Sequence, residues 1–304
     1  MELLLWISAI SLVLGFLMVD LGVFNRKPHK ISINEALITS IIWVSLALIF
    51  NGFIWVSKGS DPALAFFTGY LLEKMLSLDN MFVFVMLFQY FSIPSYHQHR
   101  ILFWGIIGAI IFRLIFIFLG LKLVEVFESI LYFFGALLVY SSYKMYWKKD
   151  ERRQIGANSL ILWIQKWLPM KKNYKGRHFF LFRDQKWYAT PAFLALLTIE
   201  ISDVIFAIDS IPAIFAITLD PFIVFSSNIF AICGLRSLYF LLAHSLTRFY
   251  YLQHAISLIL GFVGFKLLLK DIVKIPISLS LIVIFTSLAV AIIISIRKNR
   301  KMVC

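Results

Sequence analysis

The sequence predicts an all-α integral membrane protein. Of the 304 residues, 61% are hydrophobic and only 15% are charged, and long apolar stretches recur along the whole chain. A soluble domain averages roughly half apolar and about a quarter charged residues. The apolar stretches leave no room for a large soluble domain. We therefore expect residues 1–304 to form a single transmembrane domain.

Charged breaks divide the chain into about nine stretches of the roughly 20 residues that a membrane-spanning helix needs. The stretches are 3–24, 35–57, 62–91, 100–121, 126–147, 190–217, 221–246, 251–270 and 276–296. The first has no basic leader and no small-residue cleavage pattern, so we expect a retained span. Asp61-Pro62, Thr190-Pro191 and Asp220-Pro221 each pair an N-cap residue with a proline at the first helical position.

The distribution of basic residues predicts the orientation. Residues 148–189 contain eleven Lys or Arg, and basic loops stay on the cytoplasmic side. We expect the N-terminus outside, the C-terminus in the cytoplasm and 148–189 as a basic cytoplasmic loop, with an interfacial helix at 159–170 and a small hairpin at 178–188. The net charge of +13 then reflects topology and anionic lipid headgroups, not a nucleic-acid partner.

A weak internal repeat links two parts of the chain. In each part an aspartate, an arginine and a lysine occupy successive predicted spans at similar spacing. They are Asp79, Arg113 and Lys144 in the first part, and Asp203, Arg236 and Lys266 in the second. Three spans separate the copies, so the second enters the membrane from the opposite side. The sequence thus predicts an inverted repeat of three helices, 62–147 and 190–270, with a site near the membrane midplane.

Acidic residues concentrate in the third and sixth predicted spans. Each ionised side chain at a helix centre costs about 2.5–3.5 kcal/mol on insertion scales, so these acids need a compensating charge. Together with one carboxamide they form the candidate metal site: Glu73, Asp79, Asn80, Glu200, Asp203 and Asp209. An all-oxygen ligand set suits Mn²⁺, Mg²⁺ or Ca²⁺ better than Zn²⁺ or Cu⁺. We interpret the cation as transported cargo, and we expect no resident cofactor.

Basic residues offer an alternative compensation. The candidate counterion or coupling groups are Arg113, Arg236, Lys144 and Lys266. A purely structural salt-bridge network is the other interpretation of the same residues. Asp20, near the inner end of the first span, is either an inner gate or an interfacial cap.

Helical geometry limits how the acids can meet. At about 100° per residue, Glu73 and Asn80 share a face, whereas Asp79 lies about 120° from Glu73 and Asp209 about 180° from Glu200. Straight helices cannot direct all the acids to one point. We therefore expect the sixth helix to be kinked or unwound near its acids, before Pro212; otherwise there are two sites.

Other chemistry receives no support from the sequence. It contains no phosphate-binding loop, nucleotide fingerprint or nucleophile constellation, so we do not expect an enzyme. The two cysteines, Cys233 in an apolar run and Cys304 at the end, are not expected to pair.

Several stretches resemble the TerC/Alx family of bacterial integral membrane proteins. They are Asp20–Phe24, Gly69–Lys74, Ser77–Asn80, Gln98–Leu102, Tyr188–Pro191, Ile199–Ile214 and Asp220–Asn228. The resemblance covers nearly the whole chain, and the stretch in the sixth span is highly specific.

The family is associated with tellurium resistance, a response to alkaline pH and manganese export. The resemblance therefore implies a multi-pass protein of the bacterial inner membrane that exports Mn²⁺, with protons as the candidate coupling ion and the acidic positions named above as its site. The alternative is a membrane-bound stress or redox modulator, or a tellurium-resistance scaffold, whose intramembrane charges are structural. The sequence leaves the oligomeric state open.

Overall fold

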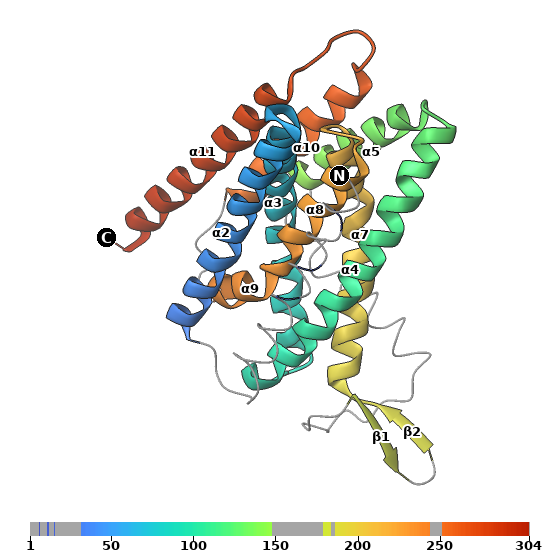
Figure 1. The fold of residues 1–304 in the computed structure, drawn as a ribbon. Helices are drawn as coiled ribbons and strands as arrows, with labels where there is room; N and C mark the ends of the chain where they lie inside the picture. The colour runs from blue at the N-terminus through green and yellow to red at the C-terminus, as the bar shows by residue number, and fades with distance from the viewer. Residues whose placement is uncertain are drawn as a thin grey trace.

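The computed structural model describes residues 32–147, 179–183, 186–243 and 251–303, together with Trp6, Ser11 and Gly15. Within these ranges the chain forms nine helices and one two-stranded sheet (Figure 1). The helices are α2 (Ile33–Lys58), α3 (Ser60–Tyr90), α4 (Ser95–Val126), α5 (Ile130–Trp147), α7 (Pro191–Phe215), α8 (Pro221–Cys233), α9 (Leu235–Ala243), α10 (Leu252–Leu268) and α11 (Ile277–Val303). The strands are β1 (Phe180–Arg183) and β2 (Lys186–Ala189).

The predicted all-α class is confirmed. Every predicted span from 35–57 onward coincides with one helix, or with the pair α8 and α9 in the case of 221–246. Most of the predicted span 3–24 and all of the segment 159–170 lie outside the described residues. The predicted hairpin at 178–188 is present as β1 and β2, paired antiparallel, and it projects from one end of the bundle (Figure 1).

Among the helices that the structure describes, four are long and apolar enough to cross a membrane: α2, α4, α7 and α11, the last through Lys298. The bent pair α8 and α9 would make a fifth. Among the other described helices, α3 carries Glu73, Lys74 and Asp79 along its length, and α10 has only 17 residues. Length and composition thus establish a helical membrane protein with four or five candidate spans.

Two of the three predicted proline caps are confirmed. The Thr190 hydroxyl accepts a bond from the Phe193 N–H at the start of α7, and the Asp220 carboxylate accepts from the Phe222 N–H at the start of α8. The third prediction is wrong by two residues, because α3 begins at Ser60 and Asp61 lies in its first turn. Gly59, at a φ of 96°, provides the sharp chain reversal between α2 and α3.

The predicted unwinding of the sixth span is wrong. The corresponding helix, α7, continues as α-helix past Asp209 and Pro212 to Phe215. Pro212 sits in the last turn, where the loss of one backbone donor is tolerated more easily than at the helix centre. The break occurs one span later, at Gly234, where α8 and α9 meet at 42°.

Contacts between helices fix their relative directions. Asn80 on α3 bonds to Asp203, while Gly69 packs on Ile214, so α3 and α7 are antiparallel. On α4, Gly105 packs on Ile199 and Gly120 on Ile211, so α4 runs parallel to α7.

Two further helix pairs show the same kinds of packing. The hydroxyls of Ser142 and Ser257 each donate to the other's carbonyl oxygen, and Gly135 packs on Gly264 nearby. These contacts make α5 and α10 antiparallel. By contrast α3 and α8 run parallel, because Gly69 packs on Ser227 and Lys74 donates to the Ala231 carbonyl.

The loops sort into two ends of the bundle, as alternating spans require. At one end Lys58 pairs with Asp220 at 3.3 Å, and Lys270 pairs with Glu128 at 2.7 Å. The second bond raises the pKa of the Lys270 amine, because the neighbouring carboxylate stabilises its charged form. At the other end the Tyr239 hydroxyl donates to Gln98, and the Arg100 guanidinium covers the Phe179 ring beside the hairpin.

The close pairing of α5 and α10 depends on small residues. A Cβ added at Gly264 would lie 2.9 Å from the Gly135 carbonyl oxygen and 3.0 Å from the Leu138 Cβ. We expect Gly264→Ala to lower the free energy of unfolding by about 1–3 kcal/mol, the usual cost of overpacking, measured as the thermal midpoint of the purified protein in detergent. The control is Gly52→Ala on α2, where nothing lies within 4 Å of the added carbon. Equal midpoints for the two variants would contradict this packing.

Candidate functional site

A single arginine joins the two helices in which the acids are concentrated. Arg113, on α4, is 1% exposed and is the largest fully buried side chain among the described residues. Its Nη2 donates to Asp203 Oδ1 at 3.1 Å, and its Nε donates to Asp203 Oδ2 at 3.3 Å. Its Nη1 donates to Glu73 Oε1 and, at 3.4 Å, to the Ser210 hydroxyl. The guanidinium therefore bonds α3 and α7 at once.

Neutral oxygen-bearing side chains complete this cluster. The Asn80 amide nitrogen donates to Asp203 Oδ1 at 3.5 Å, and Ser77, one turn from Glu73 on α3, is fully buried. Two acceptor atoms, Glu73 Oε2 and Ser77 Oγ, have no hydrogen-bond partner within the described part of the chain. Buried polar atoms are almost always bonded. The unused hydrogen-bonding capacity of these two atoms marks the cluster as a candidate ligand site.

The electrostatics of the cluster favour a cation. Glu73 is 0% exposed and Asp203 is 3% exposed, and burial of an ionised carboxylate is tolerated only when a charge partner and hydrogen bonds compensate it. One guanidinium serves both carboxylates. The group carries one net negative charge when both carboxylates are ionised, and this charge attracts a further cation.

The remaining predicted acids lie elsewhere. Asp209 faces α5, where the Ser141 hydroxyl donates to it at 2.7 Å. Glu200 packs against Gly108 on α4, and Asp79 is partly buried on α3. Within the described ranges, no three His, Cys, Asp or Glu side chains converge closely enough to hold a metal ion. The acids therefore do not form one common site, as their angular positions on straight helices predict.

The predicted bases also separate. Arg113 pairs with both Glu73 and Asp203, whereas Arg236 is 2.9 Å from His99 Nε2 and Lys266 donates to the Ser280 hydroxyl. Lys144 is exposed, with its amine 5.8 Å from the centre of the Tyr140 ring. Asp20, the candidate gate, lies outside the described residues.

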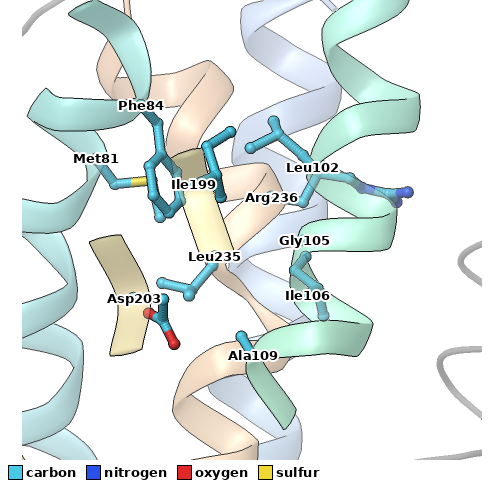
Figure 2. A pocket seen from close by; sticks show the side chains of 10 residues that line it. All are labelled: Met81, Phe84, Leu102, Gly105, Ile106, Ala109, Ile199, Asp203, Leu235 and Arg236. Carbon is cyan, nitrogen blue, oxygen red and sulfur yellow. The ribbon is translucent and has the colours of Figure 1, made fainter. Parts of the chain in front are cut away.

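A narrow cavity adjoins the cluster. It measures about 10 Å³, and its lining includes Asp203, Arg236 and apolar side chains such as Met81, Phe84 and Leu235 (Figure 2). Figure 2 shows the Arg236 guanidinium directed away from the Asp203 carboxylate. The space is close to the smallest that holds one water molecule. In this conformation the site is therefore closed.

Sequence reasoning missed several residues that shape the site. Lys74, next to Glu73, is partly buried and donates to the Ala231 carbonyl at 2.9 Å, near the end of α8. A Cβ on Gly234 would lie 2.5 Å from the Lys74 amine, so the glycine at the helix break makes room for it. His99 lies one residue before the predicted span 100–121, but it is a residue of α4 and its ring is bonded to Arg236. The only sequence signal for these roles is the glycine in the middle of the predicted span 221–246.

The fold and the cluster define a class: a polytopic helical membrane protein with an ionic centre buried between its helices. The chain belongs to the integral membrane protein TerC family, whose model matches residues 58–302. The resemblance inferred from sequence stretches is thereby confirmed. No solved structure matches the chain.

Bacterial relatives align along almost the whole length. An uncharacterised membrane protein of Myxococcus xanthus is 45% identical over 296 residues, covering 97% of this chain and 93% of its own. The Alx protein of Escherichia coli strain K12 is 45% identical over 301 residues, covering 96% and 94% respectively, and its name proposes a membrane-bound redox modulator. A membrane protein of Rickettsia bellii is 41% identical over 295 residues, with 97% and 98% covered.

The cluster predicts a strong dependence on Arg113. Arg113→Ala leaves Glu73 and Asp203 buried without their base, and removal of one partner from a buried ion pair typically costs about 3–5 kcal/mol. Adding Asp203→Asn to that variant removes one of the uncompensated charges and should recover a measurable part of the loss. The measurement is the thermal midpoint of each purified variant in detergent. A double variant no more stable than Arg113→Ala would refute the pairing, because independent sites give additive losses.

Proposed function

We propose that this protein is a secondary transporter that exports a hard divalent cation, Mn²⁺, across the bacterial inner membrane. In this proposal the chain crosses the membrane about nine times, with the N-terminus outside and the C-terminus in the cytoplasm. The segments 62–147 and 190–270 form an inverted repeat. The Glu73–Asp203 pair, with Asn80, receives the cation between the repeats.

One observation supports this function above all: two buried carboxylates, one from each proposed repeat, meet around a single cationic side chain. A guanidinium in that position is replaceable by another cation, because the carboxylate oxygens that bind it are also ligands for hard metal ions. The unbonded Glu73 Oε2 and Ser77 Oγ would add oxygen ligands beside them. The choice of Mn²⁺ over Mg²⁺ or Ca²⁺ rests on the family resemblance.

The helix directions support the inverted repeat. An inverted pair of three-helix units places equivalent helices antiparallel, as α3 and α7 are, and as α5 and α10 are. The symmetry adds a second requirement. If the second helix of the first unit is parallel to the first helix of the second unit, then the second helix of the second unit must be parallel to the first helix of the first unit. The parallel pairs α4 with α7 and α3 with α8 fit this requirement.

The mechanism follows from competition for the same carboxylates. In the closed arrangement Arg113 offsets one of the two negative charges and bonds to both carboxylates, so the empty protein does not bury two bare carboxylates. A cation that enters from one side takes the oxygens of Glu73 and Asp203, and Arg113 must move away from them. Since the arginine and the cation exclude one another, Arg113 restores the compensated state after the cation leaves.

The redox wording in the name of the E. coli relative is compatible with this activity. Direct dithiol chemistry has little basis here, since the chain has only two cysteines and Cys233 is buried within α8. A carrier for a redox-active metal ion would change the redox state of the cell indirectly, through the metal that it removes.

The test is uptake of Mn²⁺ by purified protein in proteoliposomes with an imposed pH gradient. Asp203→Asn and Glu73→Gln should each reduce uptake at least about tenfold, equivalent to about 1.4 kcal/mol of lost binding. Asp209→Asn is the matched control, because Asp209 is on the same helix as Asp203 but bonds to Ser141. Uptake by the first two variants at the level of this control would reject the proposed site. Folding of each variant is checked by its thermal midpoint.

A further inference from the structure

The environment of Glu200 differs from those of Asp203 and Asp209 on the same helix. Glu200 lies in a groove of about 350 Å³ between α4 and α7. The other groove residues are Trp104, Ile107, Gly108, Ile111, Phe193, Leu196 and Leu197, all without charge. Trp104 is 45% exposed and Ile111 is 54% exposed, so the groove opens to the outside of the described bundle. On a membrane protein this outer surface faces lipid.

The carboxyl group is fitted into a notch rather than bonded to a base. A Cβ on Gly108 would collide with Glu200 Oε1, so the missing side chain of that glycine makes the space that the carboxyl fills. The second oxygen, Oε2, is buried without a hydrogen-bond partner among the described residues. No Lys, Arg or His of the described chain forms a salt bridge with it.

The charged groups nearby do not favour ionisation of Glu200. Asp203, one turn further along α7, is an acid and would repel a second negative charge, and Arg113 on α4 is already bonded to Asp203 and Glu73. Arg236 is bonded to His99. An ionised carboxylate against hydrocarbon and without a partner costs several kcal/mol, whereas a protonated carboxyl costs far less.

We propose that Glu200 is a proton-carrying carboxyl that faces the lipid, and that it is a site of covalent modification by hydrophobic carbodiimides. In the reaction the protonated carboxyl gives its proton to one carbodiimide nitrogen, and its oxygen bonds to the central carbon. The adduct then rearranges to a stable N-acylurea, and no atom leaves. The reaction requires the proton and access from an apolar phase, which are the two properties that the groove confers.

The test is labelling of the full-length protein in native membranes with dicyclohexylcarbodiimide, followed by peptide mass spectrometry. Glu200 should gain the mass of one reagent molecule in preference to Glu73 and Asp203, whose carboxylate oxygens are bonded to the Arg113 guanidinium inside the bundle. Labelling should fall about tenfold per pH unit above the midpoint of the carboxyl, since only the protonated form reacts. A water-soluble carbodiimide should label Glu200 much less. Absence of the Glu200 adduct, or labelling independent of pH, overturns the proposal.

Two glycines on α4 provide matched variants. Gly108→Ala fills the notch and should change the labelling yield severalfold, because the carboxyl must move. Gly105→Ala, one turn away, places its carbon 3.4 Å from Ile199 in ordinary contact and should leave labelling unchanged. Equal yields from the two variants contradict the notch, and a Glu200→Gln protein confirms that the adduct is assigned to the correct residue.

Use of this proton for coupling rests on the proposed transport function. In proteoliposomes, Glu200→Gln should flatten the pH dependence of Mn²⁺ uptake while equilibrium binding of Mn²⁺ to the detergent-solubilised protein is retained. Loss of binding in this variant would instead make Glu200 a ligand and overturn its role as proton carrier. If the adduct forms but the unaltered protein transports no Mn²⁺, the modification site stands and the transport function fails.

Discussion

The bonds from Arg113 to Asp203 and Glu73 are the constraint on which the arrangement of the bundle depends. Water does not solvate a charge that is buried in a protein within the lipid bilayer. The neighbouring helices must therefore supply its hydrogen-bond and charge partners. Arg113 lies on α4 and its acids lie on α3 and α7, which obliges the three helices to meet at one level. Close approach of α4 to α7 is possible because Gly105 and Gly120 present no side chain at the contact. The glycines at the helix contacts thus allow the close approach that the shared ion cluster requires.

Three acids on α7 illustrate how rotation around one helix determines chemistry. Asp203 points to the arginine, Asp209 to a serine hydroxyl on α5, and Glu200 to an apolar groove with no base. The residue type alone does not distinguish these carboxyl groups. Their surroundings decide whether each one pairs with a cation, accepts a hydrogen bond or carries a proton. A helix that unwound at its centre would have directed the acids together, but α7 is continuous at these positions.

Much of this architecture is predictable from the sequence, because apolar length and N-cap chemistry are local. The helices begin and end near the expected residues, and Thr190 and Asp220 cap as their prolines indicate. The shared face of Glu73 and Asn80 also follows from helical periodicity alone. Contacts between distant segments do not follow from local sequence. Arg236 bonds to His99, 137 residues away, and the Lys74 amine of another helix fills the space that a side chain at Gly234 would need. Pro212 was the reason to expect that α7 unwinds. In the last turn of a helix, however, the missing backbone N–H of proline hardly weakens the helix.

The charge of the cluster connects the two proposals. With both carboxylates ionised, Glu73, Asp203 and Arg113 carry one net negative charge, and a divalent ion would reverse that sign as long as the displaced Arg113 stays inside the bundle. A reversal of this size in a medium of low dielectric is costly, and it would oppose the loading of any carrier. A carboxyl one turn away that releases its proton as the ion enters would halve the change. Glu200 has the position and the surroundings for that task, whereas Asp209, bonded to Ser141 on the opposite face of α7, does not.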